Sequence, residues 1–138
     1  MSELFAFIGN HPLLVGIFLV LIVLFVRNEV KRGGKTVTSQ ELVNLMNRES
    51  AVVLDIRDSK EYSEGHIPQA MNIPIASLQS RLKELEKYKT SPIIVACKMG
   101  QHSSLAGTML KKAGFEKVAK LRGGLLEWRN ENMPVEKG

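Results

Sequence analysis

The sequence predicts an α/β fold in which a central, mostly parallel sheet is flanked by helices and preceded by one N-terminal transmembrane helix. Two observations lead to this prediction. An uncharged apolar run extends from Leu13 to Val26 near the N-terminus. From Thr36 onward, short apolar runs alternate with segments of helical periodicity. Such β-α-β alternation is typical of parallel sheets that carry helices on both faces.

The N-terminal run is short for a membrane span when it is counted strictly. Residues 13–26 make about 21 Å of helix, against a bilayer core of about 30 Å. Counting residues 4–26 gives about 34 Å, but this stretch contains Pro12, so we expect a kink there unless Pro12 begins the main helix. A cleaved signal peptide would need Lys or Arg before the run, and none is present. A core helix would show a polar stripe, and the run has none. A single anchor in the lipid bilayer through residues 4–26 fits best.

Basic residues follow the apolar run and none precedes it. They are Arg27, Lys31, Arg32 and Lys35. The positive-inside rule predicts that the C-terminal side lies in the cytoplasm, which also suits a lone working thiol. The pair Gly33-Gly34 predicts a flexible break in a basic linker. We therefore divide the chain into an anchor with its linker, residues 1–35, and a folded domain, residues 36–138.

The apolar pattern predicts the elements of the domain in order. Thr38 to Glu41 has the form of a capping box that begins a helix. Strands are expected over residues 51–56, 70–74, 92–97 and 117–121. Helices are expected over residues 77–88, 103–114 and 124–132, with Ser77 as the cap of the first and Gly114 as the end of the second. Leu78, Leu82 and Leu85 are expected in the core.

Composition excludes several classes of function. The formal net charge is +5 and aromatic residues make up 6% of the chain, and no nucleic-acid-binding signature is present, so no nucleic acid partner is expected. The single cysteine allows neither an internal disulfide nor a multi-cysteine zinc site. His11, His66 and His102 lack the spacing of metal ligands. We expect no metal and no cofactor.

The cysteine follows a predicted strand directly, in the stretch Ile93 to Ser104. In parallel sheets, ligands sit beyond the carboxyl ends of strands, where helix N-termini present free N–H groups. Residues 98–102 are mostly polar and include a glycine, so their amides can converge on an anion, and Ser103 is the expected start of a helix. These donors and the helix dipole would favour a Cys97 thiolate. An inert cysteine that ends a buried strand is the alternative, and the local stretch does not decide between the two.

Further motifs flank this stretch on both sides. Asp55-Ile-Arg57 ends one strand, and it is followed by Glu-Tyr-Ser-Glu-Gly-His-Ile from Glu61 and Ala-Met-Asn-Ile-Pro from Ala70. Gly123-Gly124 and Trp128 follow the cysteine loop. In this order the motifs resemble the rhodanese (sulfurtransferase) family over about residues 36–133. An anchor joined to one such domain resembles a single-pass protein of the bacterial inner membrane, which implies a periplasmic N-terminus and a cytoplasmic rhodanese-like domain.

The resemblance implies a sulfurtransferase in which Cys97 carries sulfane sulfur as a persulfide. It assigns substrate binding to Arg57 and to the loop residues Lys98, Met99, Gly100, Gln101, His102 and Ser103. Asp55 would support the loop, and the segment with Glu61, Gly65 and His66 would be mainly structural. The implied partners are a sulfur donor, either thiosulfate or a persulfide, and an acceptor thiol or protein, with membrane proteins as further partners.

Two positions depart from the family pattern. His102 stands where many active members have Arg or Thr, which predicts weak thiosulfate activity for which Lys98 partly compensates. Gln69 stands where glycine is usual, which predicts an altered turn. A membrane-tethered protein-interaction module with a weak or inactive domain is therefore the alternative function. A phosphatase is not expected, because Ser103 occupies the position of the phosphate-clamping arginine.

Overall fold

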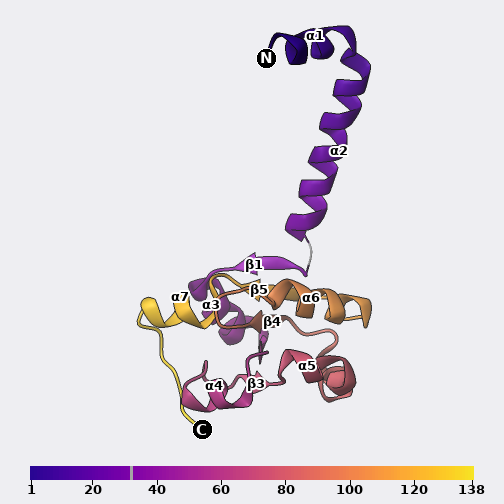
Figure 1. Cartoon of the computed structure of the whole chain (residues 1–138). Coiled ribbons are helices and arrows are strands. Elements are labelled where there is room, and N and C mark those ends of the chain that lie inside the picture. The colour runs from indigo at the N-terminus through magenta and orange to yellow at the C-terminus, as the bar shows by residue number, and fades with distance from the viewer. Residues whose placement is uncertain (32) are drawn as a thin grey trace. The chain divides into compact units, whose positions relative to one another are not determined.

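The computed structural model describes the backbone of residues 1–31 and 33–138, and the side chains of residues 1–28 and 33–138. The chain forms two compact units, Met1–Lys31 and Arg32–Gly138 (Figure 1).

The first unit consists of two helices, α1 (Ser2–Asn10) and α2 (Pro12–Lys31). The chain breaks at His11, and Ser2–Asn10 is bent by 97° from Pro12–Asn28. Pro12 begins α2, as the alternative interpretation of the sequence allows, because the first residue of a helix needs no N–H partner. Among the described residues no single helix is long and apolar enough to span a membrane, whereas the bent pair together meets both criteria.

The second unit is built on a five-stranded sheet in the order β1-β5-β4-β2-β3, and every neighbouring pair is parallel (Figure 1). This confirms the predicted parallel sheet. The strands are short and run over Lys35–Val37 (β1), Val52–Asp55 (β2), Met71–Asn72 (β3), Ile93–Ala96 (β4) and Val118–Leu121 (β5). All four residues of β4 are buried, as expected for the middle strand of a sheet covered on both faces.

Helices cover both faces of the sheet. They are α3 (Ser39–Glu49), α4 (Ser59–Glu64), α5 (Ile75–Leu78), the 3₁₀ helix η1 (Gln79–Tyr88), α6 (Ser103–Lys112) and α7 (Gly124–Asn130). One core cluster joins the sheet to α5, η1 and α6 and includes Leu78 and Leu110. The other joins it to α3, α4 and α7 and includes Leu42 and Trp128.

The local signals for helix ends were right in one case and wrong in another. The hydroxyl of Thr38 accepts a hydrogen bond from the amide of Glu41 at 3.2 Å, which confirms the predicted start of α3. Ser77 is not a cap: the helix begins two residues earlier, with Pro74 at the N-cap position, and the Ser77 amide donates to the Pro74 carbonyl at 2.9 Å. Beyond Leu78 the predicted helix continues in 3₁₀ form, with Leu78 and Leu85 buried and Leu82 partly buried against the same core.

The glycine pair expected to be a flexible break is instead buried in the second unit. Gly33 and Gly34 both have positive φ angles, of 75° and 105°. A Cβ on Gly33 would collide with the backbone of Ser104 in α6, and one on Gly34 with the Val118 carbonyl in β5. The prediction of a flexible linker here is wrong, because both glycines are held in close contacts at positive φ, and Lys35 already begins β1.

Candidate active site

Cys97 follows β4 at the point where the order of the strands reverses. The chain leaves β4 through α6 to reach β5 on one side, and it leaves β2 through α4 to reach β3 on the other. In open α/β sheets, the crevice beyond the carboxyl ends of two such strands is where ligands bind. The single cysteine of the chain is therefore located where the fold itself favours a site.

The loop after β4 closes around the sulfur of Cys97. The amide of Gly100 donates to Cys97 Sγ at 2.8 Å, and the hydroxyl of Ser103 donates to the Gly100 carbonyl at 2.8 Å. Gly100 has a φ of 88°, which a residue with a side chain rarely adopts. Of the amide donors expected from this loop, Gly100 is the one whose bond to sulfur the structure shows. The resulting turn points a backbone dipole at the thiol, as a site for a sulfur anion requires.

The side chains of the loop divide by exposure. Cys97 is 4% exposed and Ser103 is buried. Lys98, Met99, Gln101 and His102 are exposed. His102 occupies the N-cap position of α6 without a capping hydrogen bond from its side chain. The thiol of Cys97 is thus enclosed, and its neighbours present their side chains to solvent.

The N-terminus of α7 holds the other side of the loop. The amide of Leu125 donates to the Cys97 carbonyl at 2.8 Å, and the amide of Leu126 donates to the Lys98 carbonyl at 3.0 Å. Gly124 makes this approach possible, because a Cβ at that position would collide with the Cys97 carbonyl. The sequence contained the signal for this support in Gly123-Gly124, but reasoning from sequence did not assign it a role.

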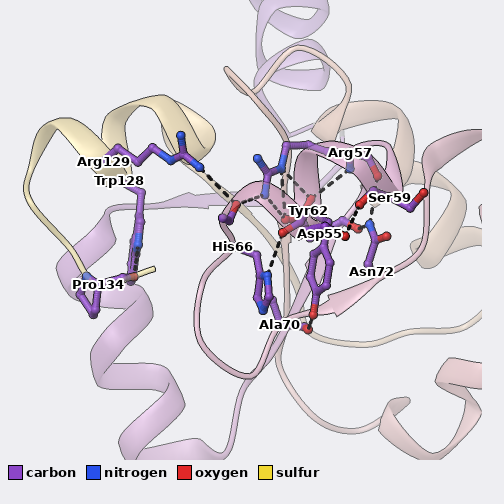
Figure 2. A network of polar contacts seen from close by, with 12 residues as sticks. Asp55, Arg57, Ser59, Tyr62, His66, Ala70, Asn72, Trp128, Arg129 and Pro134 are labelled. Carbon is purple, nitrogen blue, oxygen red and sulfur yellow. Dashed lines mark hydrogen bonds and ion pairs between the residues drawn. The ribbon is translucent and has the colours of Figure 1, made fainter. Parts of the chain in front are cut away.

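Asp55 and Arg57 form a buried ion pair at the end of β2 (Figure 2). Arg57 Nη2 donates to Asp55 Oδ2 at 2.7 Å, and Arg57 Nε donates to Asp55 Oδ1 at 3.0 Å. Arg57 Nη2 also donates to the Gly65 carbonyl at 2.8 Å, and the side-chain Nδ2 of Asn72 donates to the Asp55 and Arg57 carbonyls. These bonds fix the end of β2, and none of them reaches the cysteine loop, so support of the loop by Asp55 stays a prediction. A substrate contact by Arg57 stays a prediction.

The segment around His66 packs into the fold. His66 Nδ1 donates to the Tyr62 carbonyl at 2.8 Å, and the two rings stack at 3.8 Å between centroids (Figure 2). The backbone of His66 pairs with that of Glu136 in both directions at 2.8 Å. The Tyr62 hydroxyl donates to the Ala70 carbonyl at 2.6 Å, and burial, followed by the negative charges of Asp55 and Glu136, raises the pKa of Tyr62. These contacts agree with a structural role for the segment.

A cavity of about 400 Å³ adjoins the loop. Its lining is Arg57, Lys60, Glu61, Glu64, Lys98, Leu125, Leu126 and Arg129. Basic side chains outnumber acidic ones there, so the cavity favours anions. A larger cavity of about 540 Å³ lies between α3 and the strands β1, β4 and β5, and its lining contains no predicted site residue. No group of three or more His, Cys, Asp or Glu side chains in the described part of the chain is placed to hold a metal ion.

Comparison with known proteins agrees with this arrangement. Residues 38–131 match the rhodanese-like domain. The chain belongs to the rhodanese-like family. It is 34% identical over 142 residues to YibN, an uncharacterized protein of Escherichia coli K12, covering 100% of this chain and 99% of that protein. The family predicted from the sequence motifs is therefore confirmed.

Two further similar proteins have names that state an activity. The chain is 30% identical over 91 residues to a sulfurtransferase of Allochromatium vinosum, covering 66% of this chain and 83% of that protein. It also resembles the crystal structure of a thiosulfate sulfurtransferase from Pseudomonas aeruginosa, with a TM-score of 0.70 and 31% identity. That match covers 80% of this chain and 21% of the larger protein. The rhodanese-like domain is thus related to sulfurtransferases.

Proposed function

We propose that this protein is a membrane-anchored sulfurtransferase that carries sulfane sulfur as a persulfide on Cys97. The observation that carries the proposal is the Gly100 amide on Cys97 Sγ, at the carboxyl end of the central strand. Membership of the rhodanese-like family and the two sulfurtransferase relatives support it.

The first step loads the cysteine. The Cys97 thiolate attacks the outer sulfur of thiosulfate, a new S–S bond forms, and the S–S bond of thiosulfate breaks. Sulfite leaves with the electron pair, and Cys97–S–S⁻ remains. A persulfide donor reacts in the same way and leaves as its thiolate. The amide of Gly100, with other amides of residues 99–103, would stabilise the terminal sulfur anion as an oxyanion hole stabilises oxygen.

The second step unloads the cysteine. An acceptor thiolate attacks the terminal sulfur, which becomes the acceptor's own persulfide, and the Cys97 thiolate leaves. The chain has one cysteine, so no internal disulfide can release the sulfur. The acceptor is therefore a separate molecule, either a small thiol or a protein. Lys98, Gln101 and His102 are exposed at the loop and would contact donor or acceptor.

The first unit anchors the protein in this proposal. Large apolar side chains of α1 and α2 are exposed, such as Leu13 at 76% and Phe5 at 67%. Such a surface is stable in lipid but not in water, and the pair of helices is long and apolar enough for a span. The charges after Val26 orient the span with the N-terminus in the periplasm and the rhodanese-like domain in the cytoplasm of a bacterium. Membrane proteins would then be accessible as partners.

The intact mass of the full-length protein in detergent tests the sulfur-carrying function. Incubation with thiosulfate, or with a small-molecule persulfide, should add one sulfur, about 32 Da, and cyanide should remove it as thiocyanate. Cys97→Ser should stay folded and gain nothing. If the wild-type chain gains no sulfur from either donor, the sulfurtransferase proposal is wrong, and the tethered interaction module becomes the better explanation of the domain.

A further inference from the structure

Arginines follow both strands that flank β4. On one side, Asp55 of β2 is level with Ala96, so Arg57 is level with the loop that begins at Cys97. On the other side, Val95 is level with Lys120 of β5, and the same register continued by two residues sets Arg122 level with Cys97. Neighbouring strands lie about 4.8 Å apart. Both arginines therefore end up near the cysteine, although they are far from it in sequence.

The turn after Arg122 lies directly against the cysteine loop. A Cβ on Gly100 would lie 3.9 Å from the Gly123 amide nitrogen, and one on Gly124 would collide with the Cys97 carbonyl. The amide of Arg122 donates to the Val37 carbonyl at 2.8 Å, which fixes the backbone from which its side chain extends. Arg122 therefore stands at the rim of the loop on a fixed backbone.

The two arginines differ in how their charges are used. The guanidinium of Arg57 is buried and bonded to Asp55 and Gly65. The guanidinium of Arg122 is exposed, and within the described part of the chain it makes no ion pair and no side-chain hydrogen bond. Glu127 lies close by, since a Cβ on Gly123 would be 2.7 Å from its Oε2 atom, but it forms no ion pair with Arg122. Arg122 thus keeps a permanent charge available beside the loop.

We propose that Arg122 attracts anionic sulfur donors to Cys97 and so supplies the permanent arginine charge that is missing at the end of the loop, where His102 stands. The donor class, a small anion such as thiosulfate, rests on the proposed sulfurtransferase function. The attraction of anions to Cys97 does not depend on that function, because a nearby cation raises the local concentration of any anion. For two charges separated by one to two side-chain lengths near the surface, we expect Arg122 to raise the rate at which an anionic reagent reacts with Cys97 by about three- to tenfold. The increase should be smaller at high salt.

Alkylation rates of Cys97 test the charge without any sulfur chemistry. Iodoacetate is an anion and iodoacetamide is neutral, so the ratio of their rates on the full-length protein reports the local potential. Arg122→Gln should lower the iodoacetate rate about three- to tenfold and leave the iodoacetamide rate unchanged. Arg122→Lys should keep most of the ratio. Glu127→Gln should raise the ratio, and Arg48→Gln on α3 should leave it as in the wild type.

A thiosulfate assay adds the second measurement. Arg122→Gln should raise KM for thiosulfate by a similar factor with little change in kcat, because the charge acts on encounter and binding. An unchanged iodoacetate-to-iodoacetamide ratio in a folded Arg122→Gln variant overturns the inference. A wild-type protein that shows the ratio effect but never loads sulfur overturns the proposed function alone. A Cys97 that neither reagent modifies without denaturant overturns both.

Discussion

The side chains of Asp55 and Arg57 depend on each other for burial. Asp55 is 1% exposed and Arg57 is 8% exposed. Removing one charge of a buried pair leaves the other without compensation. Asp55→Asn should therefore lower the free energy of unfolding by about 3 kcal/mol, measured by urea denaturation. Glu84→Gln, which removes the exposed partner of Arg81, should leave the unfolding midpoint unchanged. Equal effects of the two substitutions would contradict this role for the buried pair.

Tyr62 should make the domain sensitive to alkaline pH. Burial raises the pKa of Tyr62 in the folded state above its ordinary value of about 10. The contribution of Tyr62 to stability is complete below pH 10, because the tyrosine hydroxyl is protonated there in both the folded and the unfolded chain. It is lost as the pH rises from about 10 through the folded pKa, because the unfolded chain gives up this proton first. The free energy of unfolding should fall in that range.

Tyr62→Phe and Tyr88→Phe separate this effect from general alkaline unfolding, since the chain has two tyrosines. At neutral pH, Tyr62→Phe should lower the free energy of unfolding by about 1 kcal/mol, because the hydrogen bond to the Ala70 carbonyl is lost. Above pH 10 the difference in free energy of unfolding between Tyr62→Phe and the wild type should shrink. The free energy of unfolding of Tyr88→Phe should fall with pH as that of the wild type does. A constant difference across the pH range would count against the raised pKa.

At the scale of elements, α7 and the cysteine loop work as one support. Gly124 has a φ of 59° and lies against the Cys97 carbonyl. Gly124→Ala should push the start of α7 away from the loop, destabilise the domain by about 1–3 kcal/mol and slow the loading of Cys97. Hydrogen exchange at the amides of Leu125 and Leu126 should become faster. Gly16→Ala in α2, where a Cβ meets nothing within 4 Å, is the matched control and should load at the wild-type rate.

Local patterns in the sequence were sufficient for most elements of the domain. The apolar runs before Asp55 and Cys97 became the buried strands β2 and β4, and Thr38 capped α3 as predicted. Each of these signals involves neighbours in sequence. They also placed Cys97 correctly between a strand and a helix, because a continuous apolar run precedes it and a segment of helical periodicity follows it.

What the sequence did not predict depends on partners far along the chain. Two adjacent glycines fit a flexible linker and a buried close contact equally well, and only the position of Ser104 against Gly33 decides between them. Arg122 was missed for a similar reason: its position beside Cys97 follows from β5 lying next to β4, and the order of strands in the chain does not state this. The support from α7 also joins segments that are distant in sequence.

For the whole molecule, the proposed anchor would determine where the domain works. Its exposed apolar helices and the basic residues after Val26 predict an insertion in which the N-terminus faces the periplasm. A reporter that is active only in the periplasm, such as alkaline phosphatase, should therefore be silent when fused after Gly138. A reporter that requires the cytoplasm should be active at the same position.

Reversing the flanking charges tests the proposed orientation of the anchor. Replacing Arg27, Lys31, Arg32 and Lys35 by Gln, and adding lysines before Glu3, should invert part of the population, because the positive flank is retained on the cytoplasmic side. The phosphatase signal of the C-terminal fusion should then rise in the variant. Replacing an equal number of basic residues within the domain, such as Lys83, Lys87, Lys111 and Lys112, should not change the phosphatase signal, because these residues are far from the apolar run in sequence. A strong phosphatase signal from the unaltered chain would show that the domain faces the periplasm. Recovery of the unaltered chain in the soluble fraction after cell lysis would instead remove the anchor from the proposed function.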